Sequence, residues 1–274
     1  MVKVVTDSSC DLPLELIESN GITFVPMNVV VDGRSYKEDI DITPREFWKL
    51  MSESKTLPKT SQPSPGEFAD IFNSIQSEGN TPLCITISSK LSGTYQSAQI
   101  GAQLSGNRAV VFDSLAGSLS HGIQVITASR MALQGKSVDE ILHTIEECRK
   151  NVRIIIPLLT LENIIKGGRL SKFQGGLANI LNIRIILHGV EGEVKLYKKL
   201  RGSNRFRQAI IDLIDEASRE GKKLFGITHV DNPKDAGYFA DEIKKRIPEA
   251  EVIVGTMGPT IATYAGIGGL ILAL

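Results

Sequence analysis

The feature that most constrains the fold is an alternation of short β-branched runs with longer amphipathic stretches in the first half of the chain. Several amphipathic stretches begin with a hydroxyl residue followed by proline, as in Thr43-Pro44, or by glutamate three positions later, as in Ser137-Val138-Asp139-Glu140. Both patterns cap the N-terminus of a helix. Strands that alternate with helices usually form a parallel sheet. The sequence therefore predicts an α/β fold.

The individual elements can be placed from the period of the apolar residues. Strands are expected at 2–6, 23–31, 83–88, 109–112, 153–157, 183–187, 194–199, 224–229 and 251–255. Helices are expected at 44–54, 65–78, 93–105, 119–134, 138–150, 204–220 and 234–247. Asp32-Gly33 and Glu191-Gly192 have the composition of hairpin turns, and the second turn indicates an α+β arrangement in the C-terminal half. We therefore expect a mostly parallel α/β domain at 1–150 and an α+β domain at 151–274.

Charge and cysteine content narrow the class of protein. The 31 Lys and Arg residues balance 31 Asp and Glu residues, so no overall charge points to nucleic acid or to a membrane. Cys10, Cys84 and Cys148 are odd in number and far apart, which argues against disulfides and a zinc site and fits a reducing compartment. The N-terminus reaches Asp7 too soon for a signal peptide, and the apolar stretch 261–274 is too short to span a bilayer. We expect a cytoplasmic protein without a membrane span and without a metal or cofactor.

One segment departs from the overall charge balance. Between Lys150 and Arg207 there are twelve basic and three acidic residues, a net charge of +9 (12 − 3). A basic face of this kind could receive an anionic partner or a phosphate. The alternative is a solvated face whose charges are compensated by acidic residues elsewhere in the fold.

Sequence signatures of the common enzyme classes are absent. Gly135-Lys136-Ser137 resembles the end of a phosphate-binding loop, but Arg130 stands where a glycine is required. The glycines at 266–269 precede no βαβ unit, and the chain contains neither G-x-S-x-G nor H-E-x-x-H. The four histidines lack metal-ligand spacing. Nothing in the sequence therefore indicates an enzyme that acts alone.

Four polar loops rich in small residues stand at strand ends or helix starts. The first, T-D-S-S-C-D, follows the first expected strand and contains the candidate residues Asp7, Ser8 and Ser9. Ligands of open α/β sheets bind at the carboxyl ends of strands, which favours a binding role. The alternative is a helix-capping loop, with Asp11 as the N-cap before Pro13.

Two further loops carry hydroxyl groups ahead of a helix. The loop K-T-S-Q-P-S-P is held extended by its prolines. In S-S-K-L-S-G-T-Y-Q-S-A, Ser92 lies at or near the N-cap, where its hydroxyl and the free amides of Gly93 and Thr94 can converge on an anion. These groups bind a carboxylate without carrying charge, which suits a headgroup whose tail enters apolar surroundings. Plain helix capping by Ser92 is the alternative.

The fourth loop, K-G-G-R-L-S-K, has the pattern of a helix end at which glycine supplies a left-handed backbone, followed by basic residues. In this order, the four loops resemble the DegV family of lipid-binding proteins. The match covers essentially the whole chain, and the combination of T-D-S-S-x-D-L, T-S-Q-P-S, S-S-x-L-S-G-T-Y-Q-S-A and G-G-R is far more specific than any one motif. The resemblance implies a two-domain α/β protein with one long-chain fatty acid in a tunnel between the domains.

The resemblance also implies which residues bind the fatty-acid carboxylate. By position the candidates are Thr60, Ser61, Ser92, Gly93, Thr94 and Tyr264. Tyr264 departs from the family pattern, because it stands where the family has a histidine. A tyrosine hydroxyl can donate to a carboxylate but does not supply the positive charge of an imidazolium.

Finally, the resemblance implies a partner. A carrier of this type is expected to present its ligand to a separate ATP-dependent fatty acid kinase, which makes an acyl phosphate, and to be non-catalytic itself. Arg169, Lys172 and Arg201 are the candidate docking residues. Two alternatives remain open, namely a self-sufficient small hydrolase or kinase acting at the Asp7–Ser9 loop, and a lipid-sensing regulatory module.

Overall fold

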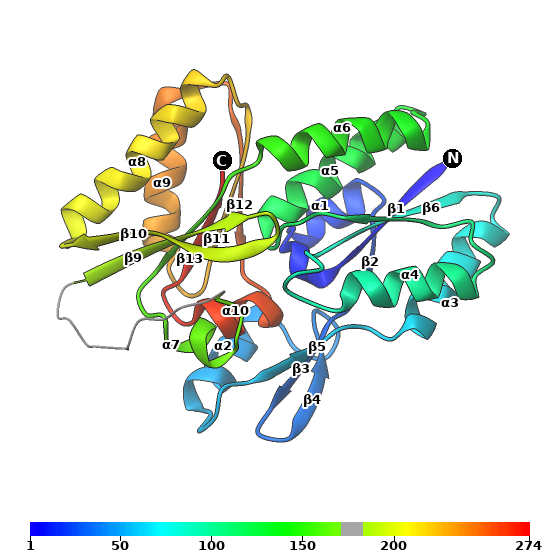
Figure 1. Ribbon diagram of the computed structural model, residues 1–274, viewed down its shortest axis with the longest axis horizontal. Helices are drawn as coiled ribbons and strands as arrows, with labels where there is room; N and C mark the ends of the chain where they lie inside the picture. Colours follow the sequence, from blue (N-terminus) through cyan, green and yellow to red (C-terminus); the bar gives the residue numbers. More distant parts are fainter. Residues whose placement is uncertain (171–182) are drawn as a thin grey trace.

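The computed structural model describes residues 1–170 and 183–274, within which the strands form three sheets (Figure 1). The N-terminal sheet has four parallel strands in the order β2-β1-β6-β7. They are β1 (Val2–Asp7), β2 (Thr23–Val25), β6 (Thr81–Thr86) and β7 (Val110–Asp113). This arrangement confirms the expected parallel sheet.

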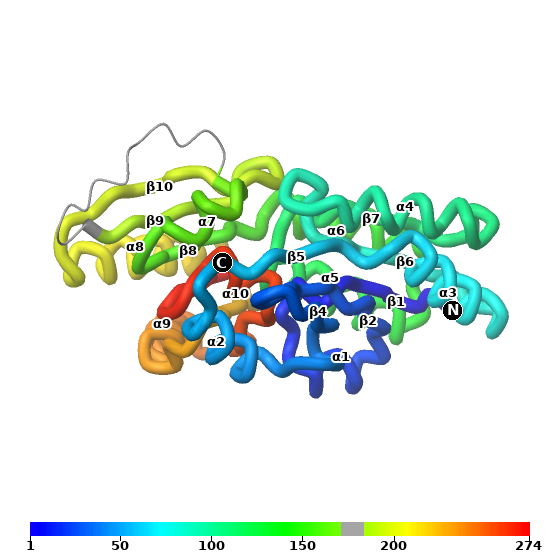
Figure 2. Tube along the Cα trace, turned by 90° about the horizontal axis from the view of Figure 1, so that it is seen from below, coloured from blue at the N-terminus to red at the C-terminus, as the bar shows by residue number. Residues whose placement is uncertain are grey.

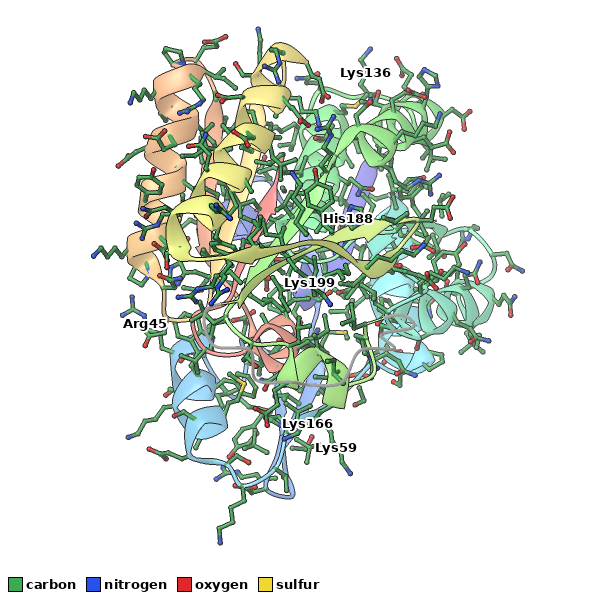
Figure 3. The ribbon with its side chains drawn as sticks, turned by 60° about the vertical axis from the view of Figure 1, so that its left-hand side comes forward. Arg45, Lys59, Lys136, Lys166, His188 and Lys199 are labelled. Atoms are coloured by element: carbon green, nitrogen blue, oxygen red, sulfur yellow. The ribbon has the colours of Figure 1, made fainter. Side chains whose placement is uncertain are left out.

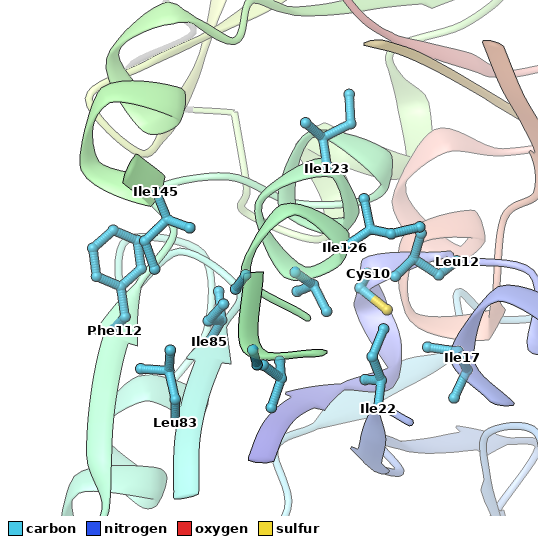
Figure 4. Close-up of a cluster of buried hydrophobic side chains, with 14 of the residues drawn as sticks. Cys10, Leu12, Ile17, Ile22, Leu83, Ile85, Phe112, Ile123, Ile126 and Ile145 are labelled. Carbon is cyan, nitrogen blue, oxygen red and sulfur yellow. The ribbon is translucent and has the colours of Figure 1, made fainter. Parts of the chain in front are cut away.

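Helices cover both faces of the N-terminal sheet. Those on one face are α3 (Pro65–Ser77) and α4 (Thr94–Leu104), and those on the other are α5 (Leu119–Leu133) and α6 (Val138–Asn151). Because side chains alternate along a strand, Val5 and Cys84 pack toward α3 and α4, whereas Val4 and Leu83 pack toward α5 and α6. Figure 4 shows the second of these clusters, in which Leu83 faces Ile145 and Phe112.

The C-terminal sheet is mixed and has six strands in the order β10-β9-β8-β13-β11-β12. They are β8 (Ile154–Leu158), β9 (Ile183–Val190), β10 (Glu193–Arg201), β11 (Leu224–His229), β12 (Glu251–Thr256) and β13 (Leu270–Ala273). Only the β11–β12 pair is parallel among these described strands. The helices α8 (Ser203–Arg219) and α9 (Pro233–Arg246) cover one face, and α5 of the first half lies against β11 and β13.

The third sheet, β4-β3-β5, is small and antiparallel. It contains β3 (Asn28–Val31), β4 (Arg34–Lys37) and β5 (Lys59–Ser61), and α2 (Pro44–Glu53) lies between β4 and β5 in the chain. Viewed from below, this segment runs across the middle of the molecule (Figure 2). Its Val29 and Trp48 share a hydrophobic core with Leu158 and Met257, so residues 28–61 pack on the C-terminal half.

Short elements complete the described chain. They are the 3-10 helix η1 (Ser8–Cys10) and the helices α1 (Leu14–Ser19), α7 (Glu162–Lys166) and α10 (Pro259–Ala265). Among the described residues, no helix is both long enough and apolar enough to cross a bilayer.

All seven expected helices are present, each within one residue of the expected bounds. Both expected hairpin turns are also confirmed, by the β3–β4 and β9–β10 pairs. The expected strand 23–31 is wrong as a single element, because the chain leaves the N-terminal sheet at Pro26 and enters the small sheet at Asn28. Proline has no N–H for a ladder bond, which explains the break.

The alternative that made Asp11 a helix N-cap is also wrong. Asp11 has a left-handed backbone (φ 52°) at the end of η1, and α1 begins after Pro13 without a side-chain cap. The strands of the N-terminal sheet all precede residue 151 in the chain, and those of the C-terminal sheet all follow it. Residues 28–61 also precede residue 151 but pack on the C-terminal half. The domain boundary itself stays a prediction.

Candidate functional site

A cavity lies where the three sheets meet. It encloses about 930 Å³, including the space at its opening to solvent. Its walls come from the loops after β6 and β7, from β5 and β8, and from α7 and α10. The loops after β6 and β7 are at the carboxyl ends of parallel strands, where open α/β sheets bind their ligands.

Most of the side chains that line the cavity are aliphatic. Among the described residues they are Met27, Ile87, Leu91, Leu115, Ala116, Ile154, Ile156, Leu158, Ile164, Val194, Ile261, Ala265 and Ile271. Ile156, Leu158 and Ile271 are buried, which places the apolar part of the cavity inside the protein. Such a surface binds a hydrocarbon chain through the hydrophobic effect and offers a polar molecule no partners.

A polar cluster, formed by Thr60, Ser92, Arg169 and Tyr264, interrupts this aliphatic lining. The Thr60 Oγ1 and Tyr264 Oη atoms are 2.7 Å apart and share a hydrogen bond. The Arg169 guanidinium lies over the Tyr264 ring, 5.0 Å from its centroid. One hydroxyl of this pair donates to the other, so the pair offers its remaining hydroxyl proton beside a permanent positive charge, which together suit an anionic headgroup.

Ser61, Gln62 and Gly93 are exposed and line the cavity next to the polar cluster. A Cβ placed on Gly93 would lie 3.0 Å from Gln62 Nε2, so the T-S-Q and S-G-T loops are in close contact. Because these neighbours are exposed, the polar cluster is at the open end of the cavity. Gln62 was not among the predicted site residues, although it belongs to the T-S-Q motif.

Ser92 lines the cavity and lies one residue before Gly93, the N-cap of α4, which has no side-chain capping bond. The Ser92 Oγ accepts a hydrogen bond from the Thr94 N–H (3.3 Å) and lies 2.8 Å from Thr94 Oγ1. Thr94 is fully buried and is not among the described residues that line the cavity. Its hydroxyl also lies 3.5 Å from the sulfur of Met27, a lining residue. The structure thus brings Thr60, Ser61, Ser92, Gly93 and Tyr264 to one cavity and places Thr94 behind it.

Arg169, predicted as a docking residue, lines the cavity. Its Nη1 donates to the carbonyl of Gly167 (2.7 Å) and its Nε donates to the carbonyl of Leu91 (3.3 Å). These bonds join the end of α7 to the loop before α4 and hold the guanidinium at the polar cluster. Docking by Arg169 stays a prediction.

The glycines of the G-G-R loop allow the backbone to approach Tyr264. A Cβ placed on Gly167 would lie 2.4 Å from Tyr264 Cε1, closer than side-chain carbons come in real proteins. Gly168 has φ +71°, the left-handed backbone expected at the end of this helix. Tyr264 can therefore lie flat against the loop only because residue 167 has no side chain.

Two buried carboxylates hold the start of α10, the helix that carries Tyr264. Glu38 accepts hydrogen bonds from Ser8 Oγ (2.5 Å) and from the Thr260 N–H, and Asp11 accepts one from the Gly258 N–H (2.8 Å). Burial raises the pKa of Glu38 to about 7 and raises the pKa of Asp11 above its ordinary value. Sequence reasoning missed Glu38, because its partners are 30 and 222 residues away in the chain.

The Asp7–Ser9 loop does not contribute to the described lining of the cavity. Asp7 is fully buried and accepts hydrogen bonds from the Ile87 N–H (2.8 Å), the Ser9 N–H (3.2 Å) and the Ser9 hydroxyl. Ser8 Oγ accepts from the Met27 N–H (2.9 Å) while donating to Glu38. These bonds fasten the end of β1 to the loops that form the cavity wall.

The other two docking candidates lie elsewhere. Arg201 is exposed at the end of the edge strand β10, and Lys172 is outside the described residues. At least five of the twelve basic residues at 150–207 pair with acidic side chains, which supports in part the reading of a compensated, solvated face. These five are Lys150, Arg153, Lys166, Lys195 and Arg207. Figure 3 labels Lys166 on α7 and Lys199 on β10.

Within residues 1–170 and 183–274, no group of three or more His, Cys, Asp or Glu side chains is placed to hold a metal ion. Fold and cavity together define an α/β protein with an aliphatic cavity between its two larger sheets and a cationic, hydroxyl-lined opening.

Comparison with known proteins agrees with this class. The family model described as "Uncharacterised protein, DegV family" matches residues 1–273, and the chain belongs to the DegV family. A DegV domain-containing protein of Caldanaerobacter subterraneus, TTE1491, is 36% identical over 271 residues, covering 97% of this chain and 95% of the relative.

Solved structures of DegV proteins have the same fold. A Thermus thermophilus DegV family protein, described by its fatty acid binding, superposes with a TM-score of 0.89 at 32% identity and 99% coverage of both chains. DegV of Bacillus subtilis, described as a fatty acid binding protein, gives a TM-score of 0.90 at 28% identity, covering 99% of this chain and 98% of that one. The expected two-part α/β fold is confirmed.

Proposed function

We propose that this protein binds one long-chain fatty acid in the cavity between its two larger sheets and presents the carboxylate to a separate kinase. The observation that carries the proposal is the polar cluster at the open end of a largely aliphatic cavity, whose described lining also includes Glu193 and Thr260. An amphipathic ligand with a single acidic group matches a cavity that is polar at its open end and largely aliphatic inside. The Thermus thermophilus and Bacillus subtilis relatives, both described by fatty acid binding, support the same ligand class.

The energetics favour a long chain. Each buried methylene contributes about 0.8 kcal/mol, so roughly a dozen methylenes contribute on the order of 10 kcal/mol before the entropy of ordering is subtracted. A carboxylate among aliphatic side chains would be expensive without compensation. Tyr264 supplies a hydroxyl, and Arg169 supplies the charge that a tyrosine lacks.

Native mass spectrometry of the protein purified from bacteria tests ligand binding directly. We expect a bound species whose mass excess equals one long-chain fatty acid and which gas chromatography identifies after extraction. Protein that is free of ligand and does not bind a fatty acid on titration contradicts the proposal.

A pair of hydroxyl deletions tests the headgroup assignment. Thr60→Val and Tyr264→Phe each remove one hydroxyl from the polar cluster and should weaken fatty-acid affinity roughly tenfold, because a hydrogen bond to a charged group is lost. The matched control is Tyr95→Phe, because Tyr95 bonds only Gln99 among the described residues and does not line the cavity. Unchanged affinity in Thr60→Val and Tyr264→Phe places the carboxylate elsewhere.

Presentation to a kinase is the second part of the proposal. It is supported by the position of the polar cluster at the open end, where the carboxylate is within reach of another protein, and by Arg169 in that cluster. Arg201→Glu reverses one exposed charge without touching the cavity lining. This variant should keep its fatty acid but lose ATP-dependent phosphorylation by the kinase of the same cell.

The same binding and phosphorylation assays on the wild type separate the carrier from the alternatives. A lipid-sensing module would bind fatty acid without supporting phosphorylation in the wild type. An enzyme acting alone at the Asp7–Ser9 loop would turn over ATP or an ester substrate without a partner. Burial of Asp7 and Ser9 leaves such a substrate no access in this structure, which favours the carrier.

A further inference from the structure

A second hollow, separate from the fatty-acid cavity, lies between α2 and the carboxyl end of β11. Its lining includes Arg45, Trp48, Lys49, His229, Asp231 and Ile267. It is a groove of about 1100 Å³, including space open to solvent, and it shares no described lining residue with the cavity. Figure 3 shows Arg45 on the outer surface at the start of α2. Nothing in the proposed function uses this groove.

The polar groups of the groove are mainly donors. Arg45 and Lys49 are four residues apart and therefore lie on one face of α2. Both are exposed, and neither has an ion pair or a hydrogen bond within the described part of the chain. Two unpaired cations side by side repel each other, and an anion between them removes that repulsion.

His229 adds a third donor from a buried position. The residue is 9% exposed, and its Nδ1 accepts a hydrogen bond from the Asn232 N–H (3.1 Å). This bond places the ring proton on Nε2. Nε2 has no hydrogen-bond partner among the described residues, so a nine-tenths buried residue of the groove keeps an unused N–H.

Acidic charge is low in the groove. Asp231 is its one acidic side chain among the described lining residues, and it stands in a left-handed backbone conformation (φ 46°). Burial lowers the pKa of His229, with Asp231 opposing this shift and Arg45 adding to it. The acceptor contact at Nδ1 and this lowered pKa both favour the neutral imidazole, which can donate through Nε2.

The rest of the groove is apolar. The Trp48 ring lies 5.9 Å from the His229 ring, centroid to centroid, and its Nε1 is already used by the carbonyl of Met257 (3.1 Å). Ile267 is 43% exposed at the edge of the groove, and Pro233 lines it nearby. A ligand with an apolar group beside its anionic end would cover this surface.

We infer that this groove binds a phosphate monoester of a small organic molecule, with the phosphate on Arg45, Lys49 and His229 and the organic group against Ile267 and Pro233. A phosphate offers three terminal oxygens for three separate donors, whereas a carboxylate offers two. The guanidinium of Arg45 matches phosphate geometry with two parallel N–H groups. The inference is independent of fatty-acid binding.

Phenyl phosphate is a suitable probe, and benzoate is its matched carboxylate. Each would be titrated into the purified full chain by calorimetry, while ¹H–¹⁵N spectra follow the His229 imidazole. The variants are Arg45→Ala and Lys49→Ala, and the control is Lys234→Ala, an exposed charge at the start of α9 outside the groove lining. All three variants replace exposed side chains, and thermal unfolding checks that each remains folded.

The expected result is saturable binding of phenyl phosphate with a shift of the His229 ring resonances and a rise of its pKa in the complex. Arg45→Ala and Lys49→Ala should each weaken binding roughly tenfold or more, and Lys234→Ala should bind like the wild type. The inference is overturned if phenyl phosphate shows no saturable binding, or if Lys234→Ala weakens its binding as much as the two groove variants do. It is also overturned if benzoate binds as tightly as phenyl phosphate.

Discussion

The buried carboxylate of Glu38 gives a prediction whose sign and size can be worked out. Glu38 is fully buried and joins Ser8 in the first loop to Thr260 at the start of α10. Its pKa is raised from 4.5 to about 7, chiefly by burial. Between those two pH values the folded protein holds a proton on Glu38 that the unfolded chain releases.

The sign follows from this difference in bound protons. A group whose pKa is raised on folding contributes stability that is fully present below its unfolded pKa and lost as the pH rises through its folded pKa. For Glu38 the window is pH 4.5 to 7. A difference of 2.5 pKa units (7 − 4.5) corresponds to about 3 kcal/mol of unfolding free energy, as an order of magnitude. Asp11, whose pKa is also raised, acts in the same direction.

Glu38→Gln isolates this contribution, because glutamine has nearly the same shape and does not ionise. Urea unfolding of the wild type and the variant at several pH values from 4.5 to 8 gives two free-energy curves. The wild type should lose stability relative to Glu38→Gln as the pH rises, and the difference should level off above pH 7. Parallel curves across the whole range would show that Glu38 does not titrate in this window and would refute the reasoning.

Further predictions concern close contacts at the cavity. Gly167→Ala should lower both the melting temperature and fatty-acid affinity, because its Cβ would overlap the Tyr264 ring, whereas Gly237→Ala, with open space inside α9, should raise the melting temperature slightly. If calorimetry gives the same change in melting temperature for both variants, the prediction is contradicted. Ser88→Ala removes a hydrogen bond (2.8 Å) from Ser88 Oγ to the carbonyl of Gly192 in the β9–β10 turn, and ligand exchange should become roughly fivefold faster. An unchanged exchange rate would show that this turn does not retain the ligand.

Local features were predicted from the sequence more accurately than long-range ones. The capping hydroxyl of Thr43 and the capping box at Ser137 exist as expected, because each depends on residues within three positions of one another. The three-residue strand β5 was missed, because it exists only through pairing with β3, about thirty residues earlier. A strand that short has no periodic pattern of its own.

In the candidate site too, local features were predicted from the sequence and long-range contacts were not. The hydroxyl loops were identified from local composition, and the structure places Thr60, Ser61 and Ser92 at one cavity. The direction of Arg169 was not predictable, since it depends on the carbonyls of Leu91 and Gly167, one of which is 78 residues away. Its charge suggested a surface role, whereas two backbone acceptors hold it beside the polar cluster.

The position of Arg169 also bears on why a tyrosine can stand at residue 264. An acid group in a largely aliphatic cavity needs a nearby positive charge, which a histidine could supply itself and a tyrosine cannot. Here the guanidinium lies over the tyrosine ring, and Gly167 leaves room for the ring to lie against the same loop. Hydroxyl and charge are therefore supplied by two residues, one on α10 and one after α7. Because arginine stays protonated at every physiological pH, this arrangement favours a carboxylate whose binding does not depend on the titration of a histidine.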